Sequence, residues 1–71
     1  MTFYDWIIRL KNHDTPTGDL ARDFLRDQES SKVSNTLEAY TDYLHSQGAC
    51  RQAVEALKTA WRSYQHYLKT H

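Results

Sequence analysis

Apolar side chains recur three and four positions apart in four segments of this chain, and this period constrains the fold most strongly. In the first segment Phe3, Trp6, Ile7 and Leu10 share one face, as the 3.6-residue turn of an α-helix requires. No Asn-Gly or Asp-Gly turn joins two alternating segments, so strands are not indicated. A length of 71 residues suits one domain. The sequence therefore predicts a compact all-α, four-helix domain over residues 1–71.

Residues that cap and break helices predict where the four helices begin and end. We expect the helices over residues 2–11, 19–28, 36–47 and about 50–71. The candidate N-caps are Thr2 for the first helix, Thr17 for the second, and Ser34 or Asn35 for the third. Pro16 and Gly18 are expected to force a loop after the first helix, and Gly48 to stop the third.

The second predicted helix has an apolar face and a charged face. Leu20, Ala21, Phe24 and Leu25 form the apolar face. The opposite face alternates acidic and basic residues at spacings of three and four, and such neighbours pair on a helix surface. We therefore expect this charged face to be solvated and to satisfy its own charges.

The chain is rich in aromatic residues, and most of them fall on inward faces. The six expected core aromatics are Phe3, Trp6, Phe24, Tyr40, Trp61 and Tyr64. Large rings give a small core most of its buried area. Tyr4, Tyr43 and Tyr67 fall at the edges of their helix faces. These three are the better candidates for a surface that contacts a partner.

The fourth predicted helix carries an apolar face and, directly opposite, a line of basic residues. The apolar face consists of Val54, Leu57, Ala60, Trp61, Tyr64 and Leu68. The basic stripe consists of Arg51, Lys58, Arg62 and Lys69. Either a nucleic-acid footprint or the solvated side of an amphipathic helix accounts for such a stripe.

The formal net charge is zero, but the charges are unevenly distributed along the chain. Residues 1–45 hold five basic and eight acidic side chains, and residues 46–71 hold four basic side chains and one acidic side chain. The two parts therefore carry −3 and +3. Such a dipolar molecule can bind an acidic partner at one end, or pair with itself head to tail. A chance split of few charges explains the same counts.

Several classes of function find no support in the residues. The only cysteine, Cys50, cannot form an intramolecular disulfide, which fits a reducing cytoplasm, and no signal peptide or membrane span is indicated. Glu38, Asp42 and His45 share a helix face but lack further ligands, so a solvated face is the better interpretation than a metal site. No phosphate-binding loop or catalytic constellation occurs. We predict a cytoplasmic protein without enzymatic activity and without a cofactor.

An ordered series of residues resembles the YozE family of small bacterial proteins. The series comprises Phe3-Tyr4-Asp5-Trp6-Ile7, Leu20-Ala21, the positions of Asp27, Lys32 and Ser34, Tyr43-Leu44, and Trp61 with Tyr64. The resemblance implies a helical fold like that of the sterile alpha motif (SAM), and it leaves the function open. Where the family has Phe-Pro, this chain has Ser30-Ser31, and we expect the connection between the second and third helices to be less anchored.

Two hypotheses of function remain at the level of sequence. The first is a non-enzymatic interaction module that binds a protein partner, or a second copy of itself, through a helix face. The alternative is an accessory protein that binds DNA or RNA through the basic stripe. The candidate partner-binding residues are Arg51, Lys58, Arg62, Lys69, Tyr67 and Tyr43. A monomer or a weakly self-associating protein is expected.

Overall fold

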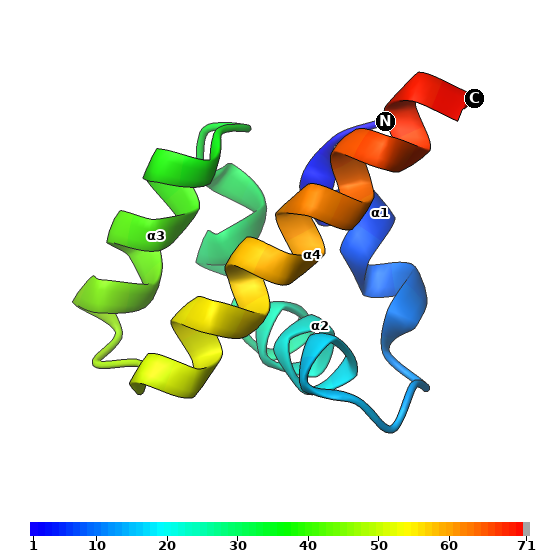
Figure 1. Cartoon of the computed structure of the whole chain (residues 1–71). Helices are drawn as coiled ribbons and strands as arrows, with labels where there is room; N and C mark the ends of the chain where they lie inside the picture. The colour runs from blue at the N-terminus through cyan, green and yellow to red at the C-terminus, as the bar shows by residue number, and fades with distance from the viewer. Residues whose placement is uncertain (71) are drawn as a thin grey trace.

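The computed structural model describes residues 1–70, which form four α-helices and two short 3₁₀ helices (Figure 1). In chain order these are α1 (Phe3–Ile7), η1 (Ile8–Leu10), α2 (Pro16–Arg26), η2 (Gln28–Lys32), α3 (Leu37–Ser46) and α4 (Arg51–Thr70). No strand occurs in this described part of the chain. The predicted all-α, four-helix architecture is therefore confirmed. Residue 71, the last of the predicted fourth helix, lies outside the described residues.

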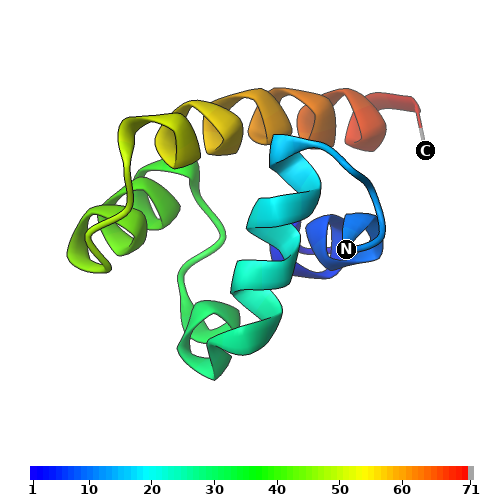
Figure 2. The same cartoon turned by 90° about the horizontal axis from the view of Figure 1, so that it is seen from below.

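The longest helix, α4, runs along one side of the molecule and contacts the three other α-helices. In Figure 1, α1 and α3 lie on opposite sides of α2, and α4 crosses in front of them. Figure 2 shows α4 at the edge of the molecule, with the remaining helices all on one side of it. One face of α4 therefore supports the core, and no helix of the described residues packs on the opposite face.

Phe3 lies at the centre of an aromatic core. Its side chain is fully buried, and its ring centroid lies 4.8–6.4 Å from those of five other aromatic residues. These five are Trp6, Phe24, Tyr40, Trp61 and Tyr64. Trp6 and Trp61 are half-buried against the core, and the other three are buried. The prediction of six core aromatics is confirmed.

Two leucines that were predicted on inward faces lie outside the core. Leu68 is 49% exposed, because the last turns of α4 extend past the rest of the molecule (Figure 2). Leu25 is 41% exposed. It follows the buried Phe24 by one residue, about 100° around α2, and so reaches the edge of the buried face. Ala56, which the prediction omitted, is buried on α4.

The second helix begins earlier than predicted. Thr15, not Thr17, is the N-cap of α2, and its hydroxyl accepts a hydrogen bond of 3.1 Å from the Gly18 amide. Pro16 does not break the helix but starts it, because the first turn has no partner for the N–H that proline lacks. Gly18 lies inside this first turn, where a Cβ would stand 2.0 Å from the carbonyl oxygen of His13. The predicted loop is therefore shorter and ends at Thr15.

The connection that contains Ser30 and Ser31 forms η2, and its anchoring relative to a Phe-Pro connection stays a prediction. Ser30 is fully buried, and its hydroxyl lies 2.7 Å from the carbonyl oxygen of Phe24 and 2.6 Å from that of Asp27. The hydroxyl thus satisfies carbonyls at the end of α2. A small polar side chain anchors the connection from inside.

The third helix begins and ends with a cap. Thr36 is the N-cap of α3 rather than Ser34 or Asn35, and its hydroxyl accepts from the Ala39 amide at 3.1 Å. The side chain of Asn35 instead accepts a 2.9 Å hydrogen bond from the Phe3 amide, which ties the start of α1 to the start of α3. Gly48 has a φ of 71°, as expected for a glycine that ends a helix.

Candidate functional site

The basic stripe lies on the outer face of α4. Arg51, Lys58, Arg62 and Lys69 are all exposed. At 100° per residue they fall within about 40° of one another, and they span about 27 Å of the helix at a rise of 1.5 Å per residue. The buried residues Leu57, Ala60 and Tyr64 lie on the opposite side. The structure therefore places four of the six predicted partner-binding residues on one continuous surface.

No residue of the basic stripe forms an ion pair within residues 1–70. The ion pairs of this part of the chain are Arg22–Asp19, Arg26–Asp23 at 3.4 Å and Lys32–Glu29 at 3.4 Å. All of them lie on α2 and η2. The prediction that the charged face of α2 satisfies itself is confirmed, and the cations of α4 face solvent without such partners.

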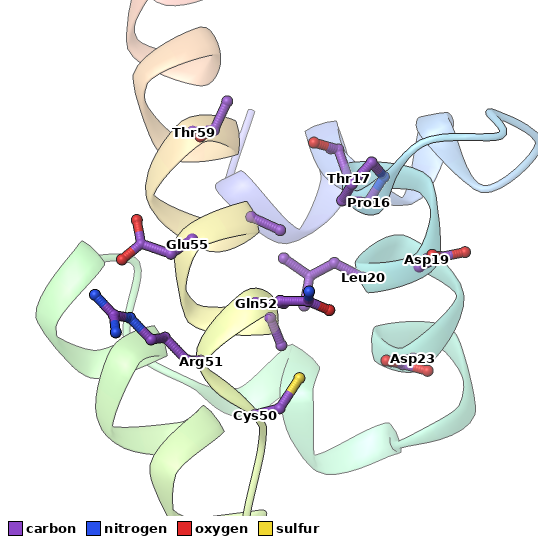
Figure 3. A pocket seen from close by; sticks show the side chains of 12 residues that line it. Pro16, Thr17, Asp19, Leu20, Asp23, Cys50, Arg51, Gln52, Glu55 and Thr59 are labelled. Carbon is purple, nitrogen blue, oxygen red and sulfur yellow. The ribbon is translucent and has the colours of Figure 1, made fainter.

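An open groove of about 770 Å³ separates the N-terminal halves of α2 and α4 (Figure 3). The sequence analysis missed it. Its apolar floor includes Leu20, Ala53 and Ala56. Figure 3 shows Leu20 and Gln52 pointing toward each other from the two helices. The groove is lined by Pro16, Thr17, Asp19, Leu20, Asp23, Cys50, Arg51, Gln52, Ala53, Glu55, Ala56 and Thr59.

Charged side chains stand on both sides of this α2–α4 groove. Asp19 and Asp23 lie on the α2 side, and Arg51 and Glu55 lie on the outer side of α4 (Figure 3). The guanidinium groups that pair with Asp19 and Asp23 come from residues that do not line the groove. Three carboxylates and one guanidinium therefore border an apolar floor.

Small side chains on α4 account for the groove. Ala53, Ala56 and Thr59 lie on the flank of α4 that faces the start of α2. Short side chains at these three positions leave unfilled the space that larger ones would occupy. The sequence signal is the set of small residues Ala53, Ala56 and Thr59 on α4, but the depth of the groove depends on how closely α2 approaches.

Tyr43, a predicted partner-binding residue, lies far from the basic stripe and has a partner within the chain. It is half-buried on α3, and its hydroxyl donates a 2.5 Å hydrogen bond to Oδ2 of Asp27. Burial, followed by this hydrogen bond, raises the pKa of Tyr43 above its ordinary value. Its hydroxyl is thus engaged in joining α3 to the end of α2.

Tyr67, the sixth predicted residue, is half-buried near the C-terminal end of α4. The Cζ atom of Arg9 lies 5.9 Å from the centre of its ring, within the range of a cation–π contact. On a regular helix Tyr67 lies about 160° around the axis from Arg51. The structure therefore does not bring Tyr67 onto the basic stripe.

The described residues hold no arrangement that suggests metal chemistry or membrane insertion. Within residues 1–70, no three His, Cys, Asp or Glu side chains are grouped closely enough to hold a metal ion. Cys50 is exposed at the start of α4, where it lines the groove. None of the helices in this part of the chain is both long and apolar enough to cross a membrane.

The chain belongs to the family described as YozE SAM-like fold, whose model matches residues 2–66. The resemblance found in the sequence is confirmed, together with the fold class. The match extends over α1, α2, α3 and most of α4. No curated protein and no solved structure matches the chain. Family membership therefore supports the fold and does not assign an activity.

Proposed function

We propose that this member of the YozE SAM-like fold family is a non-enzymatic interaction module that binds a partner protein in the α2–α4 groove. The observation that carries this proposal is the apolar floor of the groove, open to solvent between two packed helices. In protein interfaces a few anchor side chains that fill such hollows supply most of the binding free energy.

The lining of the groove favours a partner segment with an apolar anchor and basic neighbours. Leu20, Ala53 and Ala56 provide the apolar contact for the anchor. Around them Asp19, Asp23 and other charged residues give an excess of two negative charges. Opposite charges across an interface orient the partner and speed association more than they strengthen binding. We therefore expect the apolar anchor to determine the affinity.

A different protein fits the groove better than a second copy of this chain. Head-to-tail pairing would bring the basic stripe of one copy onto the carboxylates of α2 in the next. Exposed ion pairs are worth only about 0–1 kcal/mol, and no large apolar side chain lies between the cations of the basic stripe to fill the floor of the groove. We expect a monomer in low salt at high concentration, as measured by size-exclusion chromatography with light scattering.

The single cysteine allows a direct test. Cys50 is exposed and lines the groove, so a photoreactive maleimide attached to it reports on an occupant without any substitution. A matched control carries the probe on the outer face of α4, as Cys50→Ser/Gln65→Cys. After irradiation in a bacterial lysate treated with nuclease, we expect a protein adduct from Cys50 that the control does not form. Identical adducts from both positions, or none from Cys50, would contradict the proposal.

A blocking substitution adds a second readout. Ala53 is half-buried on the floor, and Ala53→Tyr should fill the hollow, whereas Gln65→Tyr places the same side chain on the outer face. We expect Ala53→Tyr to abolish the Cys50 adduct and Gln65→Tyr to preserve it, with unchanged helical circular dichroism in both variants. An adduct that survives Ala53→Tyr would show that the groove floor is not the contact.

A further inference from the structure

We infer that the outer face of α4 is a second binding surface, adjoining the α2–α4 groove at Arg51, for the phosphate backbone of a nucleic-acid duplex. Arg51, Lys58, Arg62 and Lys69 form this surface. The inference rests on four properties of the basic stripe: its position, its charge, the absence of an apolar anchor and the absence of a stacking ring.

The position of the stripe leaves it open to a large ligand. Successive cations are about 10, 6 and 10 Å apart along the axis of α4. The four cations are exposed, and Figures 1 and 2 show the other helices of residues 1–70 on one side of α4, so none of these helices covers the line of cations. A duplex carries one phosphate charge per about 1.7 Å of its axis. A stretch of duplex as long as the stripe, about 27 Å, therefore carries several times more phosphate charges than the stripe has cations.

The charge of the stripe is not neutralised within the described residues. Along α4 the four cations face one acidic residue, Glu55, which forms no ion pair in residues 1–70. This surface therefore carries a net charge of +3, although the formal net charge of the whole chain is zero. Because acidic residues lie on α2 and α3, the α4 face can approach a polyanion more favourably than those two helices can.

The polar surroundings of the stripe favour phosphates over an acidic protein. Gln65 and His66, which are its neighbours on the helix surface, are exposed, and no large apolar side chain lies between the cations. Protein interfaces need a buried apolar centre, and exposed ion pairs add little to their affinity. Binding to phosphates needs no such centre, because it is driven by the release of counterions from the nucleic acid.

The absence of aromatic rings on the stripe favours a duplex over a single strand. Proteins that bind single strands stack bases on exposed aromatic side chains. Trp61 and Tyr64 pack in the core, and Tyr67 lies on another side of α4 beside Arg9. Backbone contacts alone carry no sequence information. We therefore expect weak, sequence-independent binding, with a Kd in the range of about 10⁻⁴–10⁻⁶ M.

Fluorescence anisotropy with a labelled DNA duplex of about 20 base pairs tests the inference, because this length exceeds that of the stripe. Up to four phosphate contacts predict a slope of about −3 to −4 in a plot of log K against log salt concentration. An RNA duplex serves as a second arm, and preferential binding of either duplex identifies the source of the phosphates. Failure to retain either duplex at low salt would overturn the inference.

Two double variants with equal net charge separate the stripe from general electrostatics. Lys58→Glu/Arg62→Glu reverses two cations of the stripe, and Arg26→Glu/Lys32→Glu reverses two exposed cations on α2 and η2. We expect the first pair to reduce duplex affinity at least tenfold and the second to change it less than threefold (about 1.4 kcal/mol corresponds to tenfold). Lys58→Gln/Arg62→Gln repeats the loss without introducing acidic residues, and circular dichroism checks the fold.

Three outcomes would overturn the inference. Equal losses in both double reversals would mean that net charge, not the stripe, governs retention. Displacement of the duplex by polyglutamate at equal charge concentration would assign the stripe to acidic surfaces in general rather than to phosphates. Retention that survives both stripe variants would exclude α4 as the contact.

Discussion

The hydroxyl of Tyr43 donates a 2.5 Å hydrogen bond to the Oδ2 atom of Asp27, sixteen residues earlier in the chain. Asp27 ends α2 and also caps η2, where its Oδ1 atom accepts from the Glu29 amide at 3.0 Å. One carboxylate therefore joins the end of α2, the start of η2 and the middle of α3. Tyr43, at the edge of its helix face, therefore helps to hold α3 against the end of α2.

Tyr43→Phe should lower the free energy of unfolding by about 1–2 kcal/mol. The substitution keeps the ring against Phe24 but removes a hydrogen bond to a charged acceptor, and such bonds contribute more than neutral ones. Urea unfolding followed by circular dichroism measures the difference. Asp42→Asn, which alters an exposed residue of the same helix, is the control and should change stability by less than about 0.5 kcal/mol. Equal effects of the two substitutions would contradict the role of this hydrogen bond.

Ser30→Ala should cost about 1–2 kcal/mol, and Ser31→Ala less than about 0.5 kcal/mol. Both hydroxyls donate to backbone carbonyls, Ser31 to Gln28 at 2.8 Å, but only Ser30 is buried. Water can replace the Ser31 hydroxyl, whereas the carbonyls near Ser30 would lose their partner in the interior. The same urea experiment distinguishes them. If the two variants were equally stable, the anchor of η2 would have to lie elsewhere.

The helices of this fold could be predicted because each buries one stripe of its own sequence. The inward positions of Phe3, Phe24, Tyr40 and Tyr64 follow from their spacing alone. The start of α2 could not be fixed in the same way. Thr15 and Thr17 are both suitable caps, and proline either breaks a helix or begins one. In the structure Thr15 is the N-cap, Pro16 takes the first helical position, and Gly18 packs against the His13 carbonyl.

The candidate surfaces differ in how far the sequence could predict them. The basic stripe lies opposite the apolar face of one helix, so periodicity alone predicts that it is exposed. That its cations lack acidic partners depends on which helices lie nearby. The α2–α4 groove depends on the distance between two helices, and the sequence does not contain that distance in any local pattern. The sequence did not predict the roles of Ser30 and Asn35, because their hydrogen bonds form only in the folded chain. Ser30 bonds to the Phe24 carbonyl, and Asn35 bonds to the Phe3 amide.

Gly18→Ala should destabilise the protein by about 2–3 kcal/mol, although alanine is the better helix former by about 1 kcal/mol. A Cβ at Gly18 would stand 2.0 Å from the His13 carbonyl oxygen, so the backbone must move. Gly48→Ala makes no such contact. Its φ of 71° is unfavourable for alanine, so this substitution should lower the free energy of unfolding by about 1 kcal/mol. Thermal unfolding of both variants compares them. A Gly18→Ala variant that is more stable than the parent protein would show that the His13 backbone can move away from the new Cβ at little cost in free energy.

Stability should fall between pH 10 and about 12 because of Tyr40. Burial is the main cause that raises the pKa of Tyr40 from 10.0 to about 12. Over this interval the unfolded chain has lost the phenolic proton and the folded chain retains it. The folded state therefore binds more protons, and the free energy of unfolding decreases as the pH rises, by about 2–3 kcal/mol for Tyr40 alone. Tyr40→Phe cannot titrate, so its stability should fall less across this interval. Urea unfolding below pH 10 and near pH 12 compares the two proteins, and parallel losses would contradict the assignment to Tyr40.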